Sequence, residues 1–482
     1  MQMKNVLLFI MDDQRADTIG YLGNNEIHTP VLDNLAREGS FLRPYTTCPV
    51  CTPGRAELLS GKNAFQNGCR WFGEPIHSEI KTLPMILSDA GYHTAIFGKW
   101  HNDGHPAERG FQTTGFIFPY DLTRPIYDHN FTYEVDGKPI TGHSTELICG
   151  GAAKFIENRN EDKPWFCYVS LHSPHDPRHA PEPFASMYYD KMPSLPENYM
   201  PEHPFDNGDM LIRDERLASF PRRHNEIRRH RADYYAMITH HDYHIGKVLD
   251  ALDETGQTDN TLIIFTSDHG LAIGSHGLMG KENLYEHSAR VPLIWKGEGI
   301  PKSKRFDNSC ICGHYDFLPT ICDYLGLPKQ SEGISGISYY EVLKGTKKTV
   351  RNSITAAYRD CMRMATDGRY KLIYYPHIER YQLFDLLEDP QELNDLNLEY
   401  RRYPEGRACP PPLCREQKEY TIDEGVYKLA PRFDDTPQTP HPLLNPVYIP
   451  AIDAADADEI IKKLKSALLE WQVENNDTSC TL

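Results

Sequence analysis

The sequence lacks two features that define large classes of proteins. No stretch of its 482 residues approaches the roughly 20 apolar positions that a membrane-spanning helix needs. Positive charge is also scarce, because 51 lysines and arginines stand against 68 aspartates and glutamates, for a formal net charge of -17. Non-specific nucleic-acid binding needs a broadly basic surface. We therefore expect neither a membrane nor a nucleic acid as partner, and any anionic substrate needs a local basic pocket.

The first residues of the sequence do not have the pattern of a secretory leader. Residues 6–10 are apolar, but this run is too short for the core of a signal peptide, and Asp12 and Asp13 follow it directly. If the numbering starts at the natural start codon, we expect a cytoplasmic protein. A periplasmic or exported location applies if a leader has been removed.

The twelve cysteines lack the regular spacing of a disulfide framework, and Cys48 and Cys51 have no second C-x-x-C pair at zinc-site spacing. We interpret most of the cysteines as buried thiols. Cys409 and Cys414 bracket a proline-rich loop and are candidates for a bridge. This pattern leaves the redox compartment open.

Short apolar runs alternate with segments of helical spacing along most of the chain. The runs occupy residues 6–10, 94–97, 166–171 and 262–266. Such alternation is typical of an α/β fold with a large, mostly parallel sheet flanked by helices. Apolar positions that step by three or four predict one clear helix over residues 231–254.

The pattern changes at about residue 353. Residues 353–357, 362–366 and 370–374 resemble short strands, with Asp367-Gly368 as a hairpin turn, and an amphipathic pattern predicts a helix over 455–473. A proline-rich stretch occupies residues 404–450. We predict a large α/β domain over residues 1–350 and a smaller α+β domain over residues 351–482.

Ionisable residues follow each of the four apolar runs. In chain order these residues are Asp12 and Asp13, Lys99 and His101, His172 and His175, and Asp268 and His269. Open α/β sheets place their ligands beyond the carboxyl ends of the strands. One aspartate after a strand is commonly a turn or helix cap, but four such groups predict a shared site.

The segment that begins at Cys51 carries the most specific motif. Pro53 suits the first turn of a helix, so Cys51 lies at a helix N-terminus with Arg55 one turn further, which favours anionic character there. The full run over residues 51–61 resembles the signature of the type I sulfatases, within the alkaline-phosphatase-like superfamily. Further matches are Asp12-Asp13-x-Arg15, Gly98-Lys99-Trp100-His101, His172-Ser173-Pro174-His175, Ser267-Asp268-His269-Gly270, Gly280-Lys281, Arg290-Val291-Pro292 and Leu383-Phe384-Asp385-Leu386.

This resemblance implies that Cys51 is matured to formylglycine, whose hydrate supplies the nucleophile. A formylglycine-generating maturation enzyme and a sulfated saccharide substrate would then be the partners. The implied metal ligands are Asp12, Asp13, Asp268, His269 and an oxygen of the converted Cys51. Hard carboxylate oxygens favour Ca²⁺, whereas the softer histidine also admits Mg²⁺ or Mn²⁺.

The resemblance also implies roles in catalysis and substrate binding. Arg55 and Lys99 would hold the hydrate and neutralise charge, while Lys281 and His175 face the sulfate and the leaving oxygen. We take His175 as the general acid, His101 as the base that regenerates the aldehyde, and His172 as structural. His276, in a loop that departs from the family pattern, either contacts substrate or packs within the loop.

Two alternatives and the substrate stay open. A phosphonate or phosphodiester hydrolase of the same superfamily would share the motif, although Asp13 favours a sulfatase. A non-catalytic glycan-binding relative would leave Cys51 unconverted. His269 beside Asp268 resembles the iduronate-2-sulfatase-like branch, which suggests a 2-O-sulfated uronic acid of a glycosaminoglycan fragment. The basic stretch over residues 222–231 is either a solvated helix face or a rim that attracts an anionic glycan.

Overall fold

The computed structural model describes residues 4–118, 131–135, 138–159, 163–328, 333–397 and 454–480. The chain packs as two compact units. The first comprises Met1–Met187, Asp233–Gly270 and Ala289–Asn352, and the second comprises Tyr188–Ala232, Leu271–Ser288 and Ser353–Leu482. The second unit therefore resumes close to the predicted boundary at residue 350, but it also takes two segments that the sequence-based division leaves in the first domain. Cys409, Cys414 and the stretch over 404–450 lie outside the described residues.

The first unit is built on an eight-stranded sheet of order β10-β2-β9-β8-β1-β7-β3-β4. Its strands are β1 (Asn5–Met11), β2 (Ser40–Leu42), β3 (His93–Lys99), β4 (Thr113–Phe118), β7 (Trp165–Ser170), β8 (Thr261–Ser267), β9 (Leu293–Lys296) and β10 (Lys304–Arg305). Strands β8, β1, β7, β3 and β4 run parallel, whereas β9 is antiparallel to β8 and β2. This confirms the predicted, mostly parallel sheet, including its four predicted strands. A separate hairpin pairs β5 (Phe131–Val135) with β6 (Lys138–Gly142).

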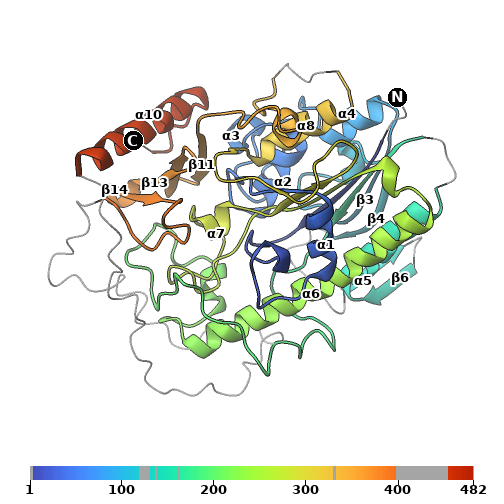
Figure 1. The fold of residues 1–482 in the computed structure, drawn as a ribbon, viewed down its shortest axis with the longest axis horizontal. Helices are drawn as coiled ribbons and strands as arrows, with labels where there is room; N and C mark the ends of the chain where they lie inside the picture. The colour runs from blue at the N-terminus through green and yellow to red at the C-terminus, as the bar shows by residue number, and fades with distance from the viewer. Residues whose placement is uncertain are drawn as a thin grey trace. The chain divides into compact units, whose positions relative to one another are not determined.

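Helices cover both faces of this sheet, because alternate residues of each central strand point to opposite sides. Leu7 and Phe9 of β1 pack with α1 (Pro30–Glu38), α5 (Ser144–Glu157) and α6 (His224–Glu254) (Figure 1). Leu8 and Ile10 pack with α2 (Cys51–Ser60), α4 (Leu83–Asp89), α8 (Phe317–Tyr324) and α9 (Tyr340–Leu343) on the other face. Two further short helices are α3 (Ala64–Asn67) and α7 (Glu286–Ala289). Helix α6 begins before the predicted start at residue 231.

The second unit contains an antiparallel sheet of order β11-β12-β13-β14. Its strands are β11 (Ile354–Tyr358), β12 (Met362–Thr366), β13 (Tyr370–Tyr375) and β14 (Arg380–Asp385). Leu464 and Leu468 of helix α10 (Ala454–Glu474) pack on Leu372 and Leu383 of the sheet. The predicted strands, the turn at Gly368 and the terminal helix are therefore confirmed.

The strand registers determine where the site forms. Met11 pairs with Ser267, Ile10 with Ser170, and Gly98 with Ser170, so β8, β1, β7 and β3 end level with one another. The residues that follow these strands therefore begin at one edge of the sheet. Among the described residues, no helix is long and apolar enough to cross a membrane.

Candidate active site

Two loops at this edge carry adjacent acidic residues. Because Met11 and Ser267 are paired in parallel strands, Asp12 and Asp268 leave the sheet side by side. Asp13 has a φ of 72°, a left-handed conformation that aspartate tolerates better than most residues. The backbone N–H of Asp13 donates to Asp268 Oδ1 at 3.2 Å, which ties the two loops together.

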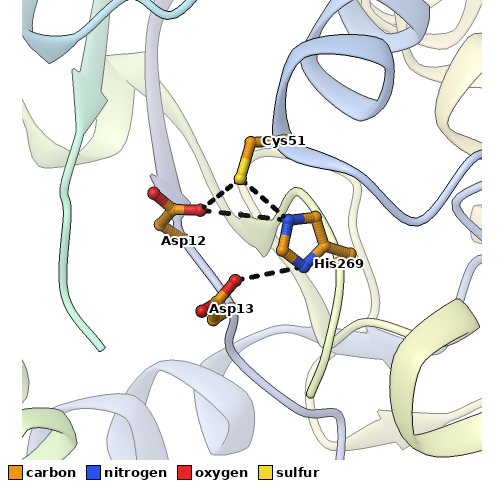
Figure 2. A group of neighbouring side chains, drawn as sticks. All are labelled: Asp12, Asp13, Cys51 and His269. Atoms are coloured by element: carbon orange, nitrogen blue, oxygen red, sulfur yellow. Dashed lines mark hydrogen bonds and ion pairs between the residues drawn. The ribbon is translucent and has the colours of Figure 1, made fainter. Parts of the chain in front are cut away.

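Cys51 joins these loops from helix α2, where it is the first residue. Its thiol is buried and lies 3.1 Å from Asp12 Oδ1 and 3.1 Å from His269 Nε2. Figure 2 shows Cys51 facing Asp12 and His269, with Asp13 on the other side of the imidazole, 3.3 Å from His269 Nδ1. One ligand atom each from Asp12, Asp13, Cys51 and His269 all lie within 4.8 Å of one another. Four of the five predicted metal ligands therefore converge.

Asp268, the fifth predicted ligand, is held mainly by Arg55. Its Oδ2 accepts from Arg55 Nε at 2.9 Å, while its Oδ1 accepts from the His269 backbone N–H at 2.9 Å. Oδ1 also lies 3.5 Å from His269 Nε2. Burial raises the pKa of Asp268 and the charge of Asp12 adds to the effect, while His269 and Arg55 act against it.

Two buried cations neutralise the carboxylates around Cys51. Burial acts to lower the pKa of Arg55, but the carboxylates of Asp268 and Asp12 hold that pKa above its ordinary value. The guanidinium also donates from Nη1 to Ser170 Oγ at 2.6 Å. Lys99, at the end of β3, forms an ion pair with Asp12 through its Nζ. Cys51 thus lies beside carboxylates that can bind a metal cation and beside the positive charges of Arg55 and Lys99, which can bind an anionic group.

The histidines predicted at the same edge lie in different surroundings. His175 Nδ1 is 2.6 Å from the Asp176 carbonyl oxygen, and Asp13, His175 and Asp176 form a second group of potential ligands within 4.8 Å. Burial and the nearby Lys99 hold the pKa of His172 well below its ordinary value, which favours the neutral imidazole. The ring of His101 packs 5.6 Å from the ring of Phe72.

Two further predicted residues belong to the second unit. Lys281 is buried there, with its Nζ 3.4 Å from Asp214 Oδ2. His276 stacks on Tyr285 at 3.9 Å between ring centroids and accepts from Asn198 Nδ2 at 3.1 Å. These contacts describe packing within the second unit, and the roles of Lys281 and His276 toward substrate stay predictions.

The basic stretch over residues 222–231 also packs within the second unit. Arg222 is buried and donates to the Gly277 carbonyl oxygen at 3.0 Å, and the guanidinium of Arg229 lies 3.8 Å from the ring centroid of Tyr189. Neither arginine is simply part of a solvated helix face.

Sequence reasoning missed several residues that hold the site in place. Ser170 links Arg55 to β3, since its hydroxyl also donates to the Lys99 carbonyl oxygen at 2.5 Å. The Tyr234 hydroxyl donates to the Asp13 carbonyl oxygen at 2.6 Å and accepts from the Arg15 N–H at 2.9 Å. Ser170 lies in the predicted run over residues 166–171, which is a usable signal, whereas Tyr234 has the spacing of an ordinary apolar position in the predicted helix over residues 231–254.

Comparison with known proteins identifies the family. The sulfatase family profile matches residues 4–327, and the profile of the C-terminal part of N-sulphoglucosamine sulphohydrolase matches residues 274–404. The chain belongs to the sulfatase family. It is therefore an enzyme that hydrolyses sulfuric esters, and membership of this family implies both a metal ion and a formylglycine made from the motif cysteine.

Individual sulfatases resemble this one along most of its length. N-acetylglucosamine-6-O-sulfatase of Bacteroides thetaiotaomicron is 28% identical over 467 residues, covering 81% of this chain and 82% of that protein. Delta 4,5-hexuronate-2-O-sulfatase of the same organism is 26% identical over 421 residues, covering 81% and 84%. A solved structure described as a complex with its substrate D-glucosamine-2-N,6-O-disulfate has a TM-score of 0.75 at 22% identity and covers 99% of both chains. That likeness confirms the fold.

Proposed function

We propose that this sulfatase removes sulfate from a sulfated saccharide. The nucleophile would be residue 51, after Cys51 has been converted to formylglycine. The observation that carries the proposal is the placement of Cys51 at the start of α2, 3.1 Å from both Asp12 and His269. Arg55 forms an ion pair with Asp268 and Lys99 forms one with Asp12, so both supply positive charge for a sulfate group. Carboxylate ligands and buried cations at one nucleophile suit the transfer of an anionic group.

We propose Ca²⁺ as the metal, held by Asp12, Asp13, Asp268, His269 and an oxygen of the converted residue 51. The donor set fits a cation, because buried carboxylate oxygens lie within 4.8 Å of the other donors. Hard oxygen donors favour calcium, whereas the imidazole of His269 leaves Mg²⁺ or Mn²⁺ as alternatives. When bound, such a cation polarises the sulfate and lowers the cost of ionising the nucleophile.

The proposed proton transfers use two histidines. His175 Nδ1 faces the Asp176 carbonyl oxygen at 2.6 Å, so Nε2 is the atom that would donate a proton to the leaving alcohol oxygen. His101 would accept the proton from the remaining hydroxyl of the formylglycine hydrate. When this hydroxyl loses its proton, its oxygen would re-form the aldehyde C=O bond as the C–O bond to the sulfate breaks, so sulfate would leave without attack by a further water molecule. Arg55, Lys99 and Lys281 would neutralise charge on the transferring group.

We propose a 6-O-sulfated glucosamine of a glycosaminoglycan-type saccharide as the substrate. Support for the 6-O-sulfate comes from the similarity to N-acetylglucosamine-6-O-sulfatase over 467 residues, and the match to the C-terminal profile of N-sulphoglucosamine sulphohydrolase supports a glucosamine. A 2-O-sulfated uronic acid is the second candidate, supported by His269 beside Asp268 and by the similarity to a hexuronate-2-O-sulfatase.

The test combines conversion of Cys51 with substrate choice. Peptide mass would first give the formylglycine content, and sulfate release would then be measured on 6-O-sulfated glucosamine, N-sulfated glucosamine and 2-O-sulfated uronic acid disaccharides. A phosphonate monoester and a Cys51→Ala variant complete the panel. We expect sulfate to be released from the 6-O-sulfated sugar, and only by protein in which Cys51 has been converted to formylglycine. Faster turnover of the phosphonate would reject the sulfate ester as the preferred substrate, and an unconverted thiol in a maturation-competent host would indicate a non-catalytic relative.

A further inference from the structure

Three potential metal ligands meet at one end of the antiparallel sheet in the second unit. Strands β11 and β12 are joined by a tight turn, in which Asp360 and Cys361 follow the last residue of β11 by two and three positions. The register of β12 with β13 pairs Arg363 with Tyr374. His377 lies two positions beyond the end of β13, in the 3₁₀ turn Pro376–Ile378, and its side chain meets that of Asp360 at this end of the sheet.

The side chains of these residues converge as well as their backbones. His377 Nε2 lies 3.4 Å from Asp360 Oδ2, and Cys361 Sγ lies 3.6 Å from Asp360 Oδ1. One ligand atom from each residue falls within 4.8 Å of the other two. Tetrahedral zinc with ordinary bond lengths separates a nitrogen from an oxygen ligand by about 3.4 Å and a sulfur from an oxygen ligand by about 3.6 Å. The His377 distance matches the first separation and the Cys361 distance matches the second, but each is measured to a different oxygen of Asp360, so a metal held by one oxygen requires a small rotation of that carboxylate.

A neighbouring loop that contains Gly208 and Asp209 packs against a third side of this cluster. The Tyr358 hydroxyl donates to Asp209 Oδ2 at 2.7 Å, which anchors the loop to the end of β11. Gly208 then packs so closely that a Cβ there would lie 3.3 Å from Cys361 Sγ and 3.4 Å from His377 Cδ2. With a φ of +99°, Gly208 also adopts a backbone conformation that glycine favours. The cluster is therefore enclosed by three segments rather than lying on one flexible turn.

The cluster is nevertheless open to solvent on one side. The side chains of Asp360 and His377 are each 49% exposed, whereas Cys361 is buried with only 3% exposed. A metal ion can therefore enter, and a water molecule has room to complete its coordination. This combination of one buried thiol and two accessible ligands differs from a surface ion pair.

We propose that Asp360, Cys361 and His377 bind a zinc ion, or a divalent transition metal with similar preferences, with water as the fourth ligand. Thiolate and imidazole are ligands that zinc and cobalt prefer, whereas calcium prefers oxygen donors. On binding, the sulfur–metal bond replaces the S–H bond, and the thiol proton passes to solvent. The metal would connect the β11–β12 turn to the end of β13, so it would stabilise the second unit. Sulfate hydrolysis would stay with the separate cluster of Asp12, Asp13, Cys51 and His269.

The proposal can be tested by titrating Co²⁺ into the full-length Cys51→Ser protein in the presence of excess Ca²⁺. The Cys51→Ser substitution removes the thiol from the active site. Calcium competes with cobalt for the carboxylate oxygens that remain there. We expect one equivalent of Co²⁺ to give a sulfur-to-cobalt charge-transfer band and Zn²⁺ to abolish it. His377→Ala, at a half-exposed position, should weaken binding at least about tenfold, while exposed His77→Ala serves as the matched control.

A second variant separates loss of the ligand from loss of the fold. Cys361→Ser should eliminate the band, and its thermal unfolding without metal shows whether the protein is folded. Zn²⁺ should raise the unfolding temperature of the Cys51→Ser protein but not that of its His377→Ala derivative. Absence of a band in the Cys51→Ser protein, or a band that survives both His377→Ala and Cys361→Ser, would overturn the proposal.

Discussion

A Cβ atom on Gly54 would lie 2.7 Å from the backbone oxygen of Asp268. The first turn of α2 therefore approaches the end of β8 more closely than any residue with a side chain allows. Cys51 precedes Gly54 by three positions on this helix, and Arg55 follows it directly. The close approach thus sets the positions of both residues relative to the carboxylates of Asp12 and Asp268.

Gly54→Ala should impair activity more than stability. The added methyl group pushes the start of α2 away from Asp268, and a displacement of about 1 Å at a reacting group can cost a hundredfold in rate. We expect kcat/KM for sulfate release to fall by roughly tenfold to hundredfold. Gly150→Ala is the matched control, because Gly150 lies within α5 with open space around its Cα. That control should leave activity unchanged and stabilise the fold by about 0.5–1 kcal/mol.

Arg55→Lys should nearly abolish sulfate hydrolysis although it keeps the charge. The guanidinium contacts Asp268 through both Nε and Nη2 at 2.9 Å and donates to Ser170 through Nη1, a set that one ammonium group cannot reproduce. We expect kcat per formylglycine-containing molecule to fall by roughly a hundredfold or more. Peptide mass must accompany the kinetics, since Arg55 lies in the maturation motif. Ser170→Ala removes only one of the contacts of the Arg55 guanidinium, so an equal loss in that variant would contradict this explanation.

The central strands could be predicted because they are buried on both faces. Parallel strands covered by helices become continuous apolar runs, and four of them were found in this way. Strand β2 has only three residues and β10 only two, which is too short for a pattern. Helix α6 starts before its predicted position because residues 224–230 are mostly basic and polar, with Ile227 as their buried apolar residue.

The candidate site was predictable in its ligands but not in its supports. Asp12, Asp13 and His269 follow strand ends and Cys51 begins the motif of α2, and all four were found from the sequence. The hydroxyl of Tyr234 reaches Asp13 across 221 positions of the chain, so no local pattern announces it. Long-range contacts also unite the two inserted segments of the second unit, where the Glu215 carboxylate accepts from the backbone N–H groups of Met279 and Gly280.

His269→Asn should change the preference for metals more than it changes activity with calcium. Asparagine replaces a nitrogen ligand by a hard amide oxygen, which suits Ca²⁺ better than Mn²⁺. After removal of metal by a chelator, sulfate release should be restored by titrating each ion. We expect the calcium requirement to change by less than about tenfold and the manganese requirement to rise, whereas His269→Ala should weaken both by roughly tenfold to hundredfold. An unchanged calcium-to-manganese ratio in His269→Asn would mean that His269 is not a ligand.

Two buried histidines of α6 should make the protein sensitive to acid. Burial lowers the pKa of His241 to about 3 and, with the neighbouring His143 and His244, lowers the pKa of His240 to about 2. An unfolded histidine binds a proton below about pH 6.5, whereas these two stay neutral in the fold. Stability is therefore fully present above pH 6.5 and is lost as pH falls, by up to about 1.4 kcal/mol per pH unit for each histidine.

The substitution that tests this acid sensitivity is His240→Phe. His240 packs against His143 at 4.4 Å and Phe184 at 5.0 Å between ring centroids, so an aromatic ring without a titrating group suits its surroundings. Urea unfolding at pH 7.5 and pH 5 should show a smaller loss of unfolding free energy in the variant than in the parent protein. His77→Phe, at an exposed position, should leave that loss as it is in the parent. Equal losses in His240→Phe and the parent would show that His240 takes up a proton in the folded state.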